Sequence, residues 1–257
     1  MSAKDMSADL DLDWHAWLRR WDAQQQGYAP ERAVMLDAVA DLLPAAFVAV
    51  DLGCGPGAIA QRLLQRFPRA RVVAVDLDPV MIALGRGALG TMAGRLRWVE
   101  TDIADPQWLT ALGEPQVDAV LSTTALHWLS ASELTRLYAD LGRLLRPGGV
   151  FLNGDNLGFP AQLPTFDRLA QRVSARQWSD AAFAARGIET AEQWWEALGR
   201  EPAMAALIAE RTRRFAGKQR LAPVDVETHV RALDAAGFGE VGTVWQVLSD
   251  RVLLALR

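Results

Sequence analysis

The sequence predicts an α/β fold: a doubly wound, mostly parallel seven-stranded sheet that ends in an antiparallel hairpin. From residue 47 to residue 153, short runs rich in β-branched residues alternate with stretches of helical periodicity, which is typical of a parallel sheet covered by helices on both faces. Near the C-terminus, only Leu248, Ser249 and Asp250 separate two strand-like runs. So short a link requires an antiparallel pair, because a parallel pair needs a crossover of a dozen or more residues.

The predicted elements follow one another with recognisable boundaries. The strands are expected at residues 47–51, 71–75, 96–100, 117–121, 149–153, 241–247 and 251–256. Asp78 and Asp105 each precede a proline and are predicted to be the N-cap acids of two helices. Ser130 and Glu133 form a capping box, and the segment "RPGG" at 146–149 ends that helix and leads into the fifth strand.

The chain is expected to be a single domain over residues 1–257 with two helical additions. Between residues 154 and 222 no strand pattern occurs, so this segment is predicted to be a helical insertion after strand five. The predicted parts are an N-terminal helical lid at 1–40, a core at 41–153, the insertion at 154–222, and a helix and hairpin that complete the sheet at 223–257.

The composition is that of an ordinary globular enzyme, with 51% apolar and 23% charged residues in a chain of 257. The longest apolar run, residues 42–50, contains Pro44 and is far shorter than the roughly 18 residues of a membrane span. The N-terminus is acidic and lacks the basic patch and apolar segment of a signal peptide. We therefore expect a cytoplasmic protein with no membrane partner.

Charge and residue types limit the function further. The net charge is −4, so a broad cationic surface for nucleic acid is not expected. The single cysteine, Cys54, excludes an internal disulfide and a cysteine-based zinc site. His15, His127 and His229 lie far apart in the sequence, so no metal site is expected.

The segment "VAVDLGCGPGA" at 48–58 predicts a nucleotide site, because glycines between a buried strand and a helix let backbone N–H groups approach a ligand. Gly53, Gly55 and Ala58 fit the dinucleotide fingerprint, which leaves a nicotinamide-dependent oxidoreductase open. Asp51 favours another cofactor. A carboxylate pointed at this turn would repel a pyrophosphate but suit a cationic group such as a sulfonium.

With Pro56 and Gly57, the loop "DLGCGPG" resembles the first motif of class I S-adenosylmethionine-dependent methyltransferases. Four more segments resemble the later motifs of that family in order: "VVAVDLDP" at 72–79, "VETDIAD" at 99–105, "VDAVLSTTALHWL" at 117–129 and "LLRPGGVFL" at 144–152. The terminal hairpin is also a feature of the family. The resemblance covers residues 47–153 and 224–257 and implies S-adenosylmethionine as cofactor and S-adenosylhomocysteine as product, without a metal.

The resemblance implies a set of cofactor-binding residues. Asp76 would bind the ribose hydroxyls, Leu77 and Met81 would flank the adenine, and Asp102 and the backbone of Ile103 would bind the adenine edge. Tyr28 and Arg32 are expected to reach the cofactor carboxylate. The remaining members of the predicted set are Asp51, Gly53, Cys54, Gly55 and Thr123.

The candidate catalytic base is His127, which follows strand four at the cofactor edge of the sheet, although packing beside Trp128 is an alternative role. Trp14, Trp17 and Trp21 share one face of an N-terminal helix, which with the insertion would form a lid over the acceptor. The predicted substrate-contacting residues are Trp21, Trp128, Asn153, Asp155 and Asn156.

The predicted function is methyl transfer to the oxygen, carboxyl group or carbon of a small molecule. The motif "ALHW" and the long insertion resemble the branch that includes trans-aconitate and small-molecule methyltransferases. A protein or RNA methyltransferase and a cofactor-binding protein without turnover remain alternatives. The basic cluster at 211–220 is either a solvated helix face or a wall of the pocket that favours an anionic acceptor. The oligomeric state is left open.

Overall fold

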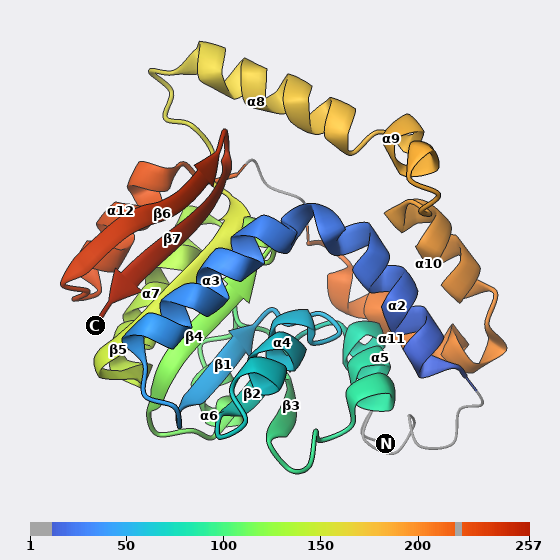
Figure 1. Cartoon of the computed structure of the whole chain (residues 1–257), viewed down its shortest axis with the longest axis horizontal. Coiled ribbons are helices and arrows are strands. Elements are labelled where there is room, and N and C mark those ends of the chain that lie inside the picture. Colours follow the sequence, from blue (N-terminus) through green and yellow to red (C-terminus); the bar gives the residue numbers. More distant parts are fainter. Residues whose placement is uncertain (1–11, 219–222) are drawn as a thin grey trace.

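The computed structural model describes residues 12–218 and 223–257 and confirms the predicted fold class (Figure 1). Seven strands form one sheet in the order β3-β2-β1-β4-β5-β7-β6, with β7 antiparallel to both neighbours and the other pairs parallel. The strands are β1 (Val48–Leu52), β2 (Arg71–Asp76), β3 (Leu96–Glu100), β4 (Val117–Thr123), β5 (Leu145–Asn156), β6 (Glu240–Val247) and β7 (Asp250–Leu256).

Helices cover both faces of the sheet, as the alternating pattern predicts. One face is covered by α3 (Ala29–Leu42), α4 (Ala58–Arg66) and α5 (Pro79–Leu89), the other by α6 (Trp108–Leu112), α7 (Ala131–Leu144) and α12 (Val226–Ala235). A separate apolar cluster lies on each face. The strands between these clusters are buried on both sides, which explains why they read as continuous apolar runs.

The order of the strands reverses beside β1. From β1 the chain continues to β2 and β3 on one side and then returns to place β4 and β5 on the other side. In open α/β sheets, ligands bind in the crevice that such a reversal leaves at the carboxyl ends of the strands. The fold therefore places a ligand site above β1, β2 and β4.

Further helices lie beyond the carboxyl ends of the strands. Trp17 and Trp21 of α2 contact the buried ring of Trp194, with ring centroids 5.6 and 5.1 Å apart. Figure 1 shows α10 and α11 beside α2. The remaining described helices are α2 (Trp14–Gln24), η1 (Gln25–Tyr28), η2 (Leu126–Trp128), α8 (Pro164–Gln177), α9 (Asp180–Ala185), α10 (Ala191–Gly199), η3 (Pro202–Met204) and α11 (Ala205–Phe215). No described helix is both long and apolar enough to span a membrane.

Two of the predicted helix starts are confirmed and one is wrong. Asp78 accepts hydrogen bonds from the first turn of α5, and Ser130 with Glu133 forms the capping box of α7. The predicted N-cap at Asp105 is wrong, because α6 begins two residues later, with Gln107 as its N-cap. Asp105 instead accepts a 2.8 Å hydrogen bond from the Gln107 N–H and stabilises the turn before the helix.

The fifth strand is longer than predicted. It starts at Leu145, immediately after α7, and runs to Asn156. The "RPGG" segment lies inside it, where the register with β4 jumps from Val117 opposite Leu145 to Ala119 opposite Val150. The left-handed backbone of Gly148 accommodates the extra residues, so the segment forms a bulge inside β5, and α7 ends at Leu144, just before this segment, as predicted.

We predict that His229 makes the stability of the fold depend on pH. The buried imidazole bonds the Tyr138 hydroxyl at 2.6 Å, and burial lowers the pKa of His229 to about 4. Between an unfolded value near 6.5 and that pKa, the unfolded chain binds more protons, so this contribution to stability is lost as the pH falls. From pH 7 to 4.5 we expect a loss on the order of 2 to 3 kcal/mol. Urea denaturation of the wild type and His229→Gln should show a smaller pH dependence in the variant. If the free energy of unfolding changes equally with pH in the wild type and in His229→Gln, the assignment is wrong.

Candidate active site

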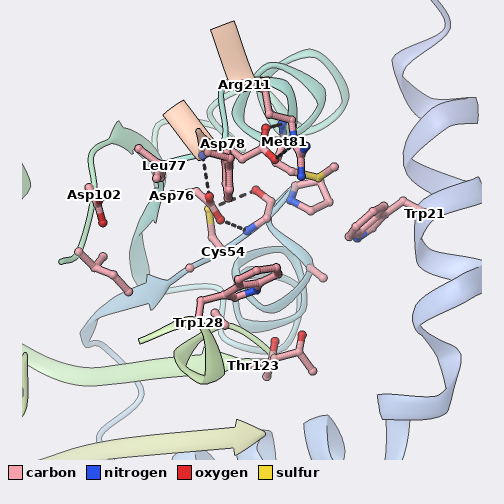
Figure 2. Close-up of a pocket in the computed structure, with 18 of the residues that line it drawn as sticks. Trp21, Cys54, Asp76, Leu77, Asp78, Met81, Asp102, Thr123, Trp128 and Arg211 are labelled. Atoms are coloured by element: carbon pink, nitrogen blue, oxygen red, sulfur yellow. Dashed lines mark hydrogen bonds and ion pairs between the residues drawn. The ribbon is translucent and has the colours of Figure 1, made fainter. Parts of the chain in front are cut away.

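A cavity of about 330 Å³ lies at the carboxyl ends of the strands, where the strand order reverses. The glycine loop after β1, the ends of β2, β3 and β4, and helices α2 and α11 contribute to its walls. Figure 2 shows Asp76 and Cys54 near the centre of this region, with Trp21 and Asp102 on opposite sides. The sequence-predicted residues that line it are Trp21, Arg32, Gly53, Cys54, Gly55, Asp76, Leu77, Met81, Asp102, Ile103, Thr123 and Trp128.

The glycine loop brings the backbone close to the cavity. Gly53 and Gly55 have φ values of +69° and +53°, a left-handed conformation that L side chains rarely adopt. A Cβ on Gly55 would meet no atom within 4 Å, so this residue faces open space. A Cβ on Gly53 would lie 2.4 Å from the Cβ of Ala125. The loop is therefore a cradle in which backbone, and not side chain, would meet a ligand.

Cys54 lines the cavity but is an inert thiol. Its side chain is buried, and burial raises the pKa of the thiol well above its ordinary value. The thiol donates to the Gly55 carbonyl at 3.3 Å. Because a nucleophilic cysteine needs a lowered pKa, Cys54 acts as a small residue of the turn.

Asp76 ends β2 and ties that strand to the glycine loop. Its Oδ2 accepts from the Gly55 N–H at 2.7 Å, and its Oδ1 accepts from the Asp78 N–H at 2.8 Å. Burial raises the pKa of Asp76 to about 6 despite these hydrogen bonds. A carboxylate has about four lone-pair positions, so both oxygens retain the capacity to accept from a ligand.

Asp51 is not among the residues that line the cavity, and its carboxylate bonds a neighbouring helix. Its Oδ2 accepts from the Ala60 N–H in the first turn of α4 at 2.8 Å, and the residue is only 1% exposed. Burial raises the pKa of Asp51 to about 7. The carboxylate therefore caps a helix behind the loop, and the electrostatic distinction between cofactors that the sequence suggests at this position does not hold.

The insertion contributes a cation to the second acid of the site. Asp102 follows β3, and its Oδ2 forms a 2.8 Å ion pair with Lys218 beyond the end of α11. Its Oδ1 accepts from the Ala104 N–H at 2.9 Å. Both partners fix the carboxylate at the edge of the cavity.

Three described residues of the basic cluster, Arg211, Phe215 and Lys218, line the cavity, and the two cations among them pair with acids of the core. Arg211 bonds Asp78 at 2.6 Å, and its guanidinium lies 4.2 Å from the centre of the Trp195 ring. Arg214 bonds Glu100 at 2.6 Å. Each described cation of the cluster therefore already pairs with a carboxylate and is not free to bind an anionic acceptor. Residues 219 and 220 of the cluster lie outside the described residues.

Sequence reasoning missed several lining residues. Arg211, Phe215 and Lys218 of the insertion lie more than 100 residues along the chain from the strand ends they face. The basic cluster was the only local signal for them. The other missed lining residues are Gln25, Pro56, Ala58, Asp78, Thr101, Thr124, Ala125, Leu129 and Trp195.

Arg32 reaches the cavity, whereas Tyr28 does not. Arg32 is 5% exposed, and its Nε lacks a hydrogen-bond partner among the described residues. Tyr28 stacks on Trp178 of the insertion at a centroid distance of 4.9 Å. The Tyr28 ring therefore supports the contact between η1 and the insertion and is not among the residues that line the cavity.

The predicted residues at the end of β5, with His127, form a second polar group outside the lining of the cavity. His127 Nδ1 lies 2.7 Å from Asp155 Oδ1. Asn156 donates to Ser249 Oγ at 2.9 Å, which joins β5 to the start of the hairpin. Asn153 is fully buried, and neither of its amide atoms has a partner among the described residues.

The sheet order, the glycine loop and the acids at the ends of β2 and β3 form the arrangement that the resemblance to class I S-adenosylmethionine-dependent methyltransferases implies. A family model described as "Methyltransferase domain" matches residues 49–149 of the chain. The matched segment runs from β1 through the glycine loop to the bulge in β5.

The most similar relatives include several trans-aconitate 2-methyltransferases. One from Azoarcus sp. is 37% identical over 136 residues, which are 51% of this chain and 48% of that protein. One from Paracidovorax citrulli is 31% identical over 183 residues, which are 69% of this chain and 63% of that protein. The chain thus spans about half the length of the first of these relatives.

Solved structures with the same fold are more distant in sequence. An O-methyltransferase family protein from Burkholderia thailandensis aligns with a TM-score of 0.55 at 18% identity, over 92% of this chain and 59% of that one. Human N-acetylserotonin methyltransferase in complex with SAM aligns with a TM-score of 0.55 at 16% identity, over 100% of this chain and 60% of that one. At these identities the likeness establishes the fold alone.

We predict that Glu31 destabilises the fold as the pH rises. Glu31 is 1% exposed, and burial raises its pKa to about 8, with Asp250 and Asp155 adding to the effect. Between its unfolded value near 4.5 and pH 8 the native state holds the extra proton, so stability falls as the pH rises through this range. Between pH 5 and pH 8, the free energy of unfolding of Glu31→Gln should rise by on the order of 2 to 4 kcal/mol relative to that of the wild type.

Guanidinium denaturation at these two pH values measures the gain. The control is Glu192→Gln, at an exposed position of α10, which should not change the pH dependence. A stability difference for Glu31→Gln that stays constant with pH would contradict the assignment.

Proposed function

We propose that this chain transfers the methyl group of S-adenosylmethionine to a small-molecule acceptor. The observation that carries the proposal is that Asp76 and Asp102, at the ends of two neighbouring strands, line one cavity together with the glycine loop. A nucleoside offers a ribose diol and an adenine amino group, and each can donate hydrogen bonds to a carboxylate. The relatives named for trans-aconitate methylation support the same class of reaction.

The adenosine half of the cofactor fits the side of the cavity formed by β2 and β3. Asp76 would accept from both ribose hydroxyls, for which its two oxygens retain free lone pairs. Asp102 would accept from the adenine amino group, and Ile103 would donate its backbone N–H to the ring. Leu77 and Met81 line the same side and would flank the adenine faces.

The amino-acid half fits the side of the glycine loop. Gly53, Cys54 and Gly55 leave backbone exposed, and the open space in front of Gly55 is a position that a Cβ would fill. Arg32 lines this cavity with an unpartnered Nε, which would bind the cofactor carboxylate. Thr123 at the end of β4 completes this wall.

The acceptor would bind beside Trp21 and Trp128, which line the cavity from α2 and η2 (Figure 2). The bound sulfonium supplies an electrophilic methyl group, so the chain has to hold the acceptor in line and exclude water. In this proposal α2 and the insertion act as the lid. His127 is the candidate proton acceptor, and Asn153, Asp155 and Asn156 at the end of β5 are further candidates for the acceptor side.

Isothermal titration calorimetry with S-adenosylhomocysteine and with NAD(H) tests the choice of cofactor. We expect micromolar binding of S-adenosylhomocysteine and no heat from NAD(H) under the same conditions, because the family model and the relatives that match this chain are described as methyltransferases. Micromolar binding of NAD(H) without binding of S-adenosylhomocysteine would overturn the proposal.

Asp76→Ala is expected to weaken the binding of S-adenosylhomocysteine at least about tenfold, roughly 1.4 kcal/mol, because it removes the acceptor of the ribose hydroxyls. The matched control is Asp234→Ala, at an exposed position of α12 on the face of the sheet away from the glycine loop, which should bind as the wild type does. Circular dichroism checks that both variants fold. A folded Asp76→Ala protein with unchanged affinity would remove Asp76 from the site.

A further inference from the structure

A second cavity, of about 680 Å³, lies between α8, the start of α12 and the turn that joins β6 to β7. Cavities of about this volume commonly hold small molecules in proteins. Seven of its ten lining residues are apolar, and none of the ten lines the cavity at the glycine loop. The second cavity is therefore a separate place on the molecule with its own chemistry.

The apolar wall on the α8 side of the second cavity is open to solvent. Leu163, Phe166 and Leu169 are 38%, 52% and 49% exposed. The ring of Phe166 meets the ring of Phe159 edge to face, with centroids 5.8 Å apart. Figure 1 shows α8 beyond the tip of the β6–β7 hairpin. Large apolar side chains that gather on an exposed surface in this way commonly mark a binding site.

One buried cation faces this apolar wall. Arg251 of β7 lines the second cavity and is only 4% exposed. The carbon of its guanidinium lies 4.8 Å from the centre of the Phe159 ring. Its Nε is fully buried and has no hydrogen-bond partner among the described residues. Its two terminal nitrogens have no such partner either, but they are not fully buried and are thus open to the cavity.

The carboxylates nearest to Arg251 in the sheet and in the cavity wall bond other groups. Asp155, opposite Arg251 in the register of β5 and β7, bonds the ring and the backbone N–H of His127. Glu227, the one acid among the lining residues, lies 3.5 Å from Arg231. Burial lowers the pKa of Arg251, and no described carboxylate offsets this shift. A buried charge without a counterion is costly, so the site favours a ligand that supplies one.

We propose that the second cavity binds an apolar monocarboxylic acid, with the carboxylate on Arg251 and the apolar part against Phe166 and Leu169. A guanidinium and a carboxylate match in a two-point geometry. A single cation in an apolar setting suits a monoanion, because a second negative charge would lack a partner there. The apolar part of the ligand would cover the side chains that α8 leaves exposed. The proposal does not depend on methyl transfer, because the two cavities share no lining residue.

Isothermal titration calorimetry of the full chain with octanoate, butanoate and 1-octanol tests the proposal. We expect octanoate to bind, and the other two to bind at least about tenfold more weakly, because butanoate lacks the apolar length and 1-octanol lacks the charge. Saturation with S-adenosylhomocysteine should leave the affinity for octanoate unchanged. Absence of octanoate binding, equal binding of octanoate and 1-octanol, or displacement of octanoate by S-adenosylhomocysteine would overturn the proposal.

Arg251→Met removes the cation and keeps most of the apolar length of the side chain. We expect the affinity for octanoate to fall at least about tenfold, to that of 1-octanol, because the charge preference is lost. The affinity for 1-octanol should stay unchanged, which a general disruption of the cavity would not allow. Circular dichroism checks the fold. An octanoate affinity equal to that of the wild type would show that Arg251 does not bind the carboxylate.

Leu169→Gln tests the apolar wall at an exposed position of α8, where the fold should tolerate the change. The variant is expected to bind octanoate and 1-octanol alike at least about threefold more weakly than the wild type does. The matched control is Leu42→Gln, because Leu42 is 44% exposed at the end of α3 and lines neither cavity. It should bind octanoate as the wild type does. Equal octanoate affinities of Leu169→Gln and Leu42→Gln would overturn the assignment of this wall.

Discussion

The hydrogen bond from Gly55 to the carboxylate of Asp76 is the constraint on which the site depends. It joins the loop after β1 to the end of β2, so these two neighbouring strands share one partly buried polar contact. Removing a carboxylate from water is costly, and here two backbone donors compensate part of that cost. The raised pKa of Asp76 shows that the compensation is incomplete. A ligand that donates further hydrogen bonds to this group would complete it.

The insertion closes the site by pairing its cations with acids of the core. Arg211, Arg214 and Lys218 reach Asp78, Glu100 and Asp102, which all lie at the ends of β2 and β3 or just beyond them. Partly exposed pairs of this kind add little to stability, because salt and side-chain entropy weaken them. Their effect is to position α11 over the cavity, with Trp195 and Phe215 packed against Arg211. The site is thus built from two parts of the chain that are distant in sequence.

Much of the fold was predictable because its signals are local. The strand runs, the caps at Asp78 and Ser130, and the short link between the last two strands each act over a few residues and gave the correct sheet. The acids at strand ends were predictable for the same reason, since parallel strands end at one edge. Asp51 shows where this reasoning fails: the pattern locates a carboxylate before the loop but does not determine that it turns toward the N–H of Ala60.

Contacts between distant segments could not be predicted. The pairing of Lys218 with Asp102 spans 116 positions, and the contact of His127 with Asp155 depends on β4 and β5 lying side by side. The sequence suggested each residue of the latter pair alone, one as a base and one as a substrate contact. Their direct contact is what links the candidate base to a carboxylate that orients it.

A crystal structure of the full chain with S-adenosylhomocysteine tests the central claim most directly. We expect the nucleoside in the cavity of about 330 Å³, with both ribose hydroxyls within hydrogen-bond distance of Asp76 and the adenine edge facing Asp102 and Ile103. Density for the nucleoside elsewhere on the chain, or in this cavity without contact to Asp76, would contradict it.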